Sequence, residues 1–97
     1  MMTWRDKTMR LLRDDDAWGM LKQLAADSAQ KQRPAVDLVS MMPSLPDPTK
    51  PKRMIRAAFE CGLIRASTKG NVVWYILSPR GRQLVDLIKA IEIAGGP

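Results

Sequence analysis

The sequence predicts a single domain of the α+β class, mainly α-helical with one β-hairpin. Apolar residues recur at helical spacing along most of the chain, the period changes to two over residues 63–77, and helical spacing returns after Ser78-Pro79. The length of 97 residues suits one domain with a modest core. Apolar residues make up 45% of the chain and charged residues 27%, which is typical of a folded protein and excludes wholesale disorder.

The N-terminal part of the chain is expected to form three helices. Residues 3–13 form the first helix, with Thr3 as its N-cap. The acidic triplet that begins at Asp14 caps a second helix, which is either separate from the first or joined to it as one bent helix. Residues 30–34 are polar and interrupt the helical pattern, and residues 35–42 then form a short apolar helix.

A basic helix is predicted over residues 50–61. It follows a proline-rich loop at 43–48, Thr49 is its expected N-cap, and Pro51 fits the first helical turn, where its missing N–H costs nothing. Gly62 is expected to end the helix in the left-handed conformation. The residues expected to face the core are Ile55, Ala58, Phe59 and Gly62. Another face carries Lys52, Arg56 and Glu60 at i, i+4 and i+8, with Arg53 beside them.

The β-hairpin has a basic tip, because the turn residues 68–71 read Thr-Lys-Gly-Asn. Trp74 is expected to pack in the core, and Tyr75 points to the opposite face of the hairpin. A final amphipathic helix runs from residue 79 to about 93, and residues 95–97 form a frayed tail. The apolar stripe of this helix consists of Leu84, Leu87, Ile88 and Ile91.

The composition excludes most enzyme chemistry. The chain has no histidine and a single cysteine, Cys61, which excludes histidine-activated nucleophiles and zinc sites with histidine ligands. We therefore expect no enzymatic activity, no metal and no cofactor. No apolar run approaches the length of a membrane span, no secretory signal is present at the N-terminus, and the unpaired cysteine fits a reducing cytoplasm.

The positive charge of the chain is concentrated in one segment. The net charge is +6, yet residues 1–48 contain seven basic and seven acidic residues. Residues 49–82 contain eight basic residues and one acid, Glu60, so this segment carries +7. A segment of one sign beside a neutral one is typical of a surface that binds a polyanion. The basic residues are Lys50, Lys52, Arg53, Arg56, Arg65, Lys69, Arg80 and Arg82.

Two stretches of the sequence resemble the winged helix-turn-helix family of DNA-binding domains. Residues 55–64, Ile-Arg-Ala-Ala-Phe-Glu-Cys-Gly-Leu-Ile, are similar to the end of a recognition helix that leads into the first wing strand, where family members often read leu-x-x-leu-glu-x-x-gly-leu-ile. Residues 75–82, Tyr-Ile-Leu-Ser-Pro-Arg-Gly-Arg, are similar to the family's tyr-x-leu-thr-pro-lys-gly-arg. MarR-like and PadR-like bacterial regulators carry such segments, and the similarity covers about residues 14–91.

The resemblance implies a small, repressor-like regulator of transcription that binds double-stranded DNA sequence-specifically. Residues 14–94 form the DNA-binding domain, the helix 50–61 enters the major groove, and the wing 63–77 lies on the flanking backbone. The implied DNA contacts are Thr49, Lys50, Lys52, Arg53, Arg56, Arg65, Lys69, Asn71, Arg80 and Arg82.

The resemblance also implies a homodimer, because one winged domain contacts too little DNA for tight, specific binding. The terminal helices, within residues 1–13 and 79–93, are the expected dimer elements, with Trp4 and Leu11 as the partner stripe for the last helix. No small-molecule ligand is implied. Two alternatives stay open: a protein-interaction module whose basic face meets an acidic protein, and RNA binding.

Overall fold

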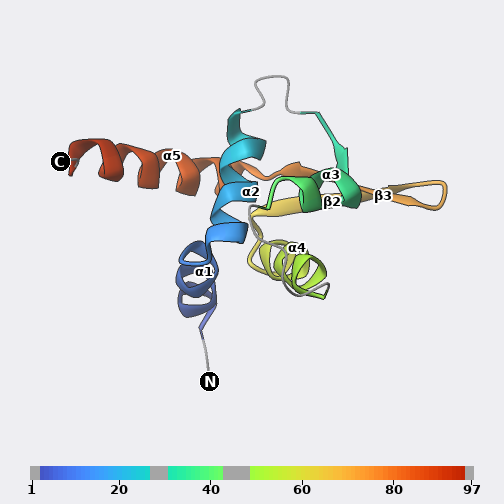
Figure 1. Ribbon diagram of the computed structural model, residues 1–97, viewed down its shortest axis with the longest axis horizontal. Helices are drawn as coiled ribbons and strands as arrows, with labels where there is room; N and C mark the ends of the chain where they lie inside the picture. The colour runs from blue at the N-terminus through green and yellow to red at the C-terminus, as the bar shows by residue number, and fades with distance from the viewer. Residues whose placement is uncertain (1–2, 27–30, 43–48, 96–97) are drawn as a thin grey trace.

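The computed structural model describes residues 3–26, 31–42 and 49–95, and these ranges contain five helices and a three-stranded antiparallel sheet (Figure 1). The predicted α+β architecture is confirmed. The end of the second helix, the loop at 43–48 and residues 96 and 97 of the tail lie outside the described residues. The elements are α1 (Trp4–Leu12), α2 (Asp15–Ala26), β1 (Arg33–Pro34), α3 (Ala35–Ser40), α4 (Lys50–Glu60), β2 (Ile64–Lys69), β3 (Val72–Leu77) and α5 (Pro79–Ala94).

The two N-terminal helices are separate, and side-chain caps account for the break between them. Thr3 Oγ1 accepts a hydrogen bond from the Asp6 backbone N–H at 3.2 Å, and the Asp6 carboxylate accepts one from the Thr3 N–H, which forms a capping box. Asp14 Oδ1 accepts from the backbone N–H groups of Asp16 at 2.9 Å and Ala17 at 3.3 Å. Asp14 therefore begins α2 as its N-cap, as the sequence predicts.

The core is built around α2, which runs through the middle of the molecule with α1, α4, α5 and the sheet around it (Figure 1). Burial of apolar side chains from all these elements supplies the main free energy of folding. Within the described ranges, no helix combines the length and the apolar character that a membrane span requires. The largest fully buried apolar side chains are those of Met20, Leu21, Leu38, Leu63, Ile64 and Val85.

The sheet differs from the expected hairpin in having a third strand. β1 pairs with β3, with Arg33 opposite Tyr75 and Pro34 opposite Trp74, so the strand order is β1-β3-β2. A strand of two residues is too short to show a period of two in the sequence. The hairpin turn is also tighter than expected, because Lys69 still pairs with Val72 and only residues 70 and 71 make the turn.

The two faces of the hairpin are the reverse of the expected assignment. Both aromatic residues are partly buried, but Tyr75 packs against the core, whereas Trp74 lies on the other face. The reason is the end of the strand: Leu77 is buried, and side chains two residues apart lie on the same face. Phe59 was also expected in the core but is 50% exposed.

The junction of α4, β2 and α5 is held by a short network of backbone groups. Gly62 has a φ of 73°, and the N–H groups of Leu63 and Gly62 donate to the carbonyls of Ala58 and Phe59, which is a Schellman motif. Ser78 Oγ donates to the Gly62 carbonyl at 2.6 Å and accepts from the Gly81 backbone N–H at 2.9 Å, as the expected N-cap of α5. This network fixes the direction in which the wing leaves α4.

Replacing Gly81 by alanine should destabilise the protein strongly. A Cβ at this position would lie 2.2 Å from the backbone oxygen of Leu63, which cannot move without breaking the junction. We expect a loss of about 3 kcal/mol in the free energy of unfolding. Gln83→Ala, an exposed change on the same helix, is the control. Thermal unfolding followed by circular dichroism compares them, and equal melting temperatures for the two variants would contradict the close approach.

Candidate nucleic-acid interface

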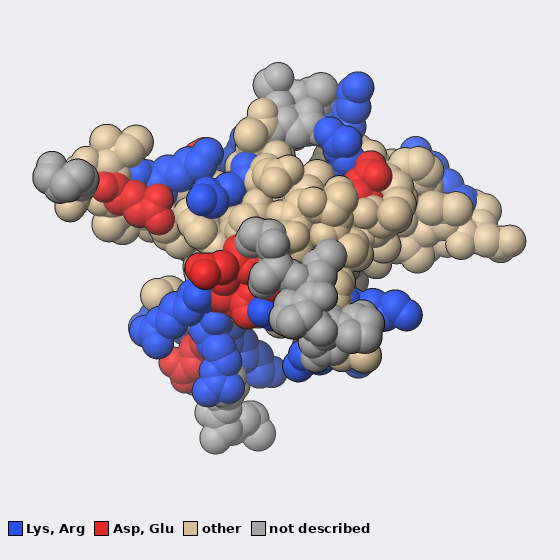
Figure 2. Space-filling model, in the orientation of Figure 1, with Lys and Arg blue, Asp and Glu red and all other residues tan. Residues whose placement is uncertain are grey.

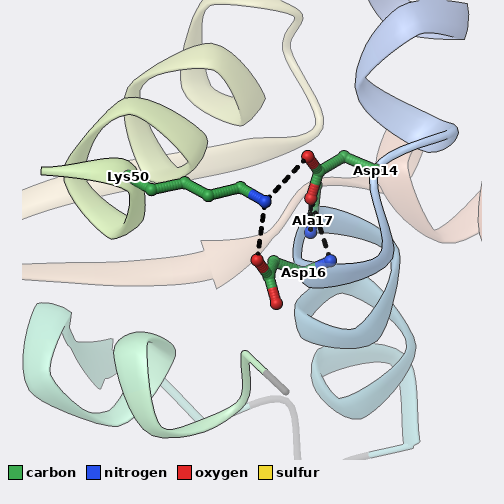
Figure 3. A network of polar contacts seen from close by, with 4 residues as sticks. All are labelled: Asp14, Asp16, Ala17 and Lys50. Atoms are coloured by element: carbon green, nitrogen blue, oxygen red, sulfur yellow. Dashed lines mark hydrogen bonds and ion pairs between the residues drawn. The ribbon is translucent and has the colours of Figure 1, made fainter. Parts of the chain in front are cut away.

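The first turn of α4 is attached to the first turn of α2 by a lysine between two carboxylates (Figure 3). Lys50 Nζ lies 2.8 Å from Asp16 Oδ2 and 3.1 Å from Asp14 Oδ2. The Asp16 side chain is 1% exposed, whereas Lys50 remains one-quarter exposed. Asp14 uses its other oxygen as the N-cap of α2, so the same residue starts one helix and positions another.

These contacts raise the pKa of Lys50 above its ordinary value of 10.5, first through the hydrogen bond to Asp16 and then through the one to Asp14. Lys50 is therefore charged throughout the neutral range. Its charge is balanced within the protein, because both partners are carboxylates at ion-pair distance. Among the ten residues predicted to contact DNA, Lys50 thus has a role in positioning α4 that the sequence did not reveal.

The outward side of α4 carries three exposed cations, Lys52, Arg53 and Arg56. Arg56 Nε donates to Glu60 Oε1 at 3.0 Å, and the two side chains are 81% and 55% exposed. An ion pair this exposed contributes little stability, so Arg56 can exchange Glu60 for another acceptor at small cost.

The wing lies beside this side of α4, with a groove between them. The groove has a volume of about 400 Å³, and Lys52 and Arg56 from α4 line it together with Ala66 and Tyr75 from the sheet. Phe59 lines it too, which accounts for the exposed position of this ring. Lys52, Arg53 and Arg56 of α4 and Arg65, Lys69 and Asn71 of the wing are all exposed, and we call the surface that these six residues span the α4–wing face. Within it, Arg65 and Lys69 alternate along β2 with Ala66 and therefore point away from the groove that Ala66 lines.

Arg80, Arg82 and Thr49 have different surroundings. The Arg80 guanidinium stacks 4.6 Å from the centre of the Trp4 ring, and Trp4 Nε1 donates to the Cys61 carbonyl at 2.8 Å. Arg80 is nevertheless exposed, beside the end of α4. Arg82 Nη1 donates to the Ala25 carbonyl at 3.3 Å, at the opposite end of α2 from α4. Thr49 is the exposed N-cap of α4, without a side-chain capping bond.

One cation near the wing was missed in the sequence. Lys31 lines a hollow together with Lys69, Gln32 and Trp74, and both lysines are exposed. The pairing of β1 with β3 brings Lys31 to the wing, and Gln32 Nε2 donates to Ser67 Oγ at 3.2 Å across the same sheet. No signal in the sequence marked Lys31, because β1 itself was not predicted.

The described residues contain no group of three His, Cys, Asp or Glu side chains that could hold a metal ion. Cys61, expected to be a buried thiol, is 3% exposed at the end of α4. The predicted site residues that the structure describes are therefore mostly cations on an exposed surface.

The fold is a winged helix-turn-helix, in which α3 and α4 form the helix pair and β2 and β3 form the wing. The chain is similar to AF1382 from Archaeoglobus fulgidus, with 16% identity, a TM-score of 0.69, and coverage of 93% of this chain and 98% of that one. It is also similar to the homodimeric winged helix-turn-helix DNA-binding domain of a possible ArsR-family transcriptional regulator from Mycobacterium bovis, with 17% identity, a TM-score of 0.69, and coverage of 91% and 77%.

An ArsR-like transcriptional regulator from Rhodococcus is a third similar structure, with 20% identity, a TM-score of 0.61, and coverage of 95% of this chain and 79% of that one. No family model matches the sequence, and no curated protein sequence is significantly similar to it. These likenesses confirm the winged helix-turn-helix fold, while the MarR-like or PadR-like type stays a prediction.

Asp16→Asn should loosen the attachment of α4 to α2. The substitution keeps the shape of the side chain but removes the buried charge that Lys50 contacts, and we expect a loss of about 2 kcal/mol in the free energy of unfolding. Asp15→Asn, an exposed change in the same helical turn, is the control and should cost less. Thermal unfolding measures both, and an equal loss would mean that the Lys50 contact does not stabilise the fold.

The pH dependence gives a second readout of the same contact. Because the pKa of Lys50 is raised in the folded protein, its stabilising effect is fully present below pH 10.5 and is lost as the pH rises through the folded-state pKa. Wild-type stability should therefore fall more steeply at alkaline pH than that of Asp16→Asn.

Proposed function

We propose that the protein is a small transcriptional regulator that binds duplex DNA through the α4–wing face. The observation that carries the proposal is the gathering of five exposed cations on α4 and the wing, which in this fold are the recognition helix and the element beside it. The similar structures from Mycobacterium bovis and Rhodococcus, described as transcriptional regulators, support this function. Repression is the mode that we favour, because a bound protein blocks a DNA site without any further contact.

The residues of α4 would read the bases. Arg53 and Arg56 project from its exposed side, and a guanidinium can donate two parallel hydrogen bonds to O6 and N7 of guanine. Lys52 would act as a point charge towards a phosphate or guanine. The N-terminus of α4, with Thr49 as its N-cap, suits a phosphate oxygen, because the first N–H groups of a helix have no acceptor within the helix itself.

The wing would hold the neighbouring backbone. Lys69 and Asn71 lie at its exposed tip, Arg65 follows along β2, and Lys31 adds a charge beside them. Arg80, at the end of α4, faces outward and can reach a phosphate while it stacks on Trp4. Lys50 and Arg82 fit a positioning role better, since each is bonded within the protein.

The protein would bind DNA as a homodimer that pairs chiefly through α5. Leu87, Ile91 and Ile93 are 57%, 61% and 82% exposed, and they lie on the half of α5 that extends away from the domain (Figure 1). Of the expected partner stripe on α1, Leu11 is buried in the protomer's own core, whereas Trp4 is 45% exposed and donates to the Cys61 carbonyl. An exposed apolar helix is most simply covered by the same helix of a second copy.

Binding to duplex DNA should depend steeply on salt. If about five of the cations on this side meet phosphates, log K falls with log salt concentration at a slope of about −4 to −5 per protomer. Fluorescence anisotropy of a labelled mixed-sequence duplex, titrated at several salt concentrations, measures the slope. Absence of binding at low salt would contradict the proposed function.

The same titrations separate base reading from backbone contact. Sequences selected from random duplexes supply the specific site, against which Arg53→Ala and Arg56→Ala should lose roughly 1–3 kcal/mol of discrimination each. Lys69→Ala should instead weaken binding to specific and random duplexes equally. Equal losses for all three variants would place the base reading on other residues.

The double variant Leu87→Glu/Ile91→Glu should be a folded monomer with weaker DNA binding. Both side chains are more than half exposed in the protomer, so their replacement should leave the core intact while four charges repel across the dimer. Sedimentation and circular dichroism of wild type and variant test this. A wild type that sediments as a monomer at high micromolar concentration, or an unfolded variant, would contradict pairing through α5.

A further inference from the structure

The outward side of α1 is strongly basic, although residues 1–48 as a whole have no net charge. Arg5, Lys7, Arg10 and the C-cap residue Arg13 are all exposed, and Lys7 and Arg10 lie on the flank of the helix next to the buried Leu11, towards α4. We call these four residues the α1 basic face. Figure 2 shows basic side chains gathered over α1, at the lower edge of the molecule where α4 also lies.

Most of the acidic side chains near this face already form hydrogen bonds or ion pairs with other groups of the protein. Asp6 completes the capping box of α1, and Asp14 and Asp16 hold Lys50. Glu60 of α4 is paired with Arg56. Asp15 is the one exposed acid without such a contact in the described part of α2, and no member of the α1 basic face forms an ion pair within the described ranges. The positive charge is therefore available to an external anion.

The α1 basic face lies beside α4, on the flank of that helix away from the wing. A groove of about 350 Å³ separates the two helices, with Lys7 and Arg10 on one wall and Met54, Ala57 and Glu60 on the other. The groove towards the wing lies on the opposite flank of α4, where Lys52, Arg56 and Phe59 line it. The exposed side of α4 thus lies between two basic elements, the wing on one flank and α1 on the other.

We propose that the α1 basic face contacts the DNA phosphate backbone on the side of the major groove away from the wing. A major groove is about 12 Å wide and has a backbone on each edge, and neighbouring helices have axes about 8–10 Å apart. With α4 in the groove, α1 lies over one edge and the wing over the other. This inference rests on the proposed DNA-binding function and adds Lys7 and Arg10 as its principal new contacts.

The test compares two double variants that each remove two positive charges. Lys7→Gln/Arg10→Gln changes the α1 basic face, whereas Lys22→Gln/Lys89→Gln changes α2 and α5 at positions outside both grooves. Loss of two phosphate contacts should reduce the slope of log K against log salt by about 2 per protomer in the first variant, at about 0.9 per contact. The second variant should keep the wild-type slope. Thermal unfolding and sedimentation confirm that both keep the wild-type fold and oligomeric state.

Hydroxyl-radical footprinting on a selected site gives a positional readout. The wild type should protect the backbone on both edges of the major groove, and the Lys7→Gln/Arg10→Gln variant should lose protection on the edge away from the wing. Equal slopes and unchanged footprints for the two double variants would overturn the role of α1. If Arg56→Ala weakens binding at the same time, the proposed function stands and only this inference fails; if the wild type binds no duplex, both fail.

Discussion

The placement of α4 depends on the buried carboxylate of Asp16. A lysine in the first turn of a helix is unfavourable to that helix, because the N-terminal end already carries partial positive charge. Acids in the first turn of α2 are favourable for the same reason. The carboxylates of Asp14 and Asp16, which stabilise the start of α2, therefore also offset the unfavourable position of the Lys50 charge at the start of α4. As a result, the position of the first turn of α4 depends on the first turn of α2.

The far end of α4 is fixed by hydrogen bonds to backbone carbonyls. Trp4 donates to Cys61, Ser78 donates to Gly62, and the backbone at Gly81 lies so close to Leu63 that no side chain fits between them. α1, the wing and α5 thus all meet where α4 ends. Both ends of α4 are thus held by groups that face inward, whereas the exposed ion pair of Arg56 with Glu60 on its outward side contributes little to stability.

Structural features that depend on neighbouring residues could be predicted from the sequence, whereas features that depend on contacts between distant residues were missed. The N-caps at Thr3 and Ser78 and the left-handed Gly62 follow from local chemistry, and all three are present. The third strand, the packing of Tyr75 rather than Trp74 against the core, and the pairing of Lys50 each depend on partners far along the chain. Periodicity within a single element carries no information on such partners.

The charge pattern illustrates the same limit at the level of function. Counting charges along the chain assigns the whole positive excess to residues 49–82, but a ligand meets a surface rather than a segment. Folding pairs Lys50 with Asp14 and Asp16 of the neutral half, so the charge of one cation of the basic segment is balanced within the protein by two carboxylates, of which Asp14 lies beside α1. It also brings Lys31 to the wing and the cations of α1 to the flank of α4. The basic surface available to a polyanion is consequently wider than the basic segment, and it is centred on α4.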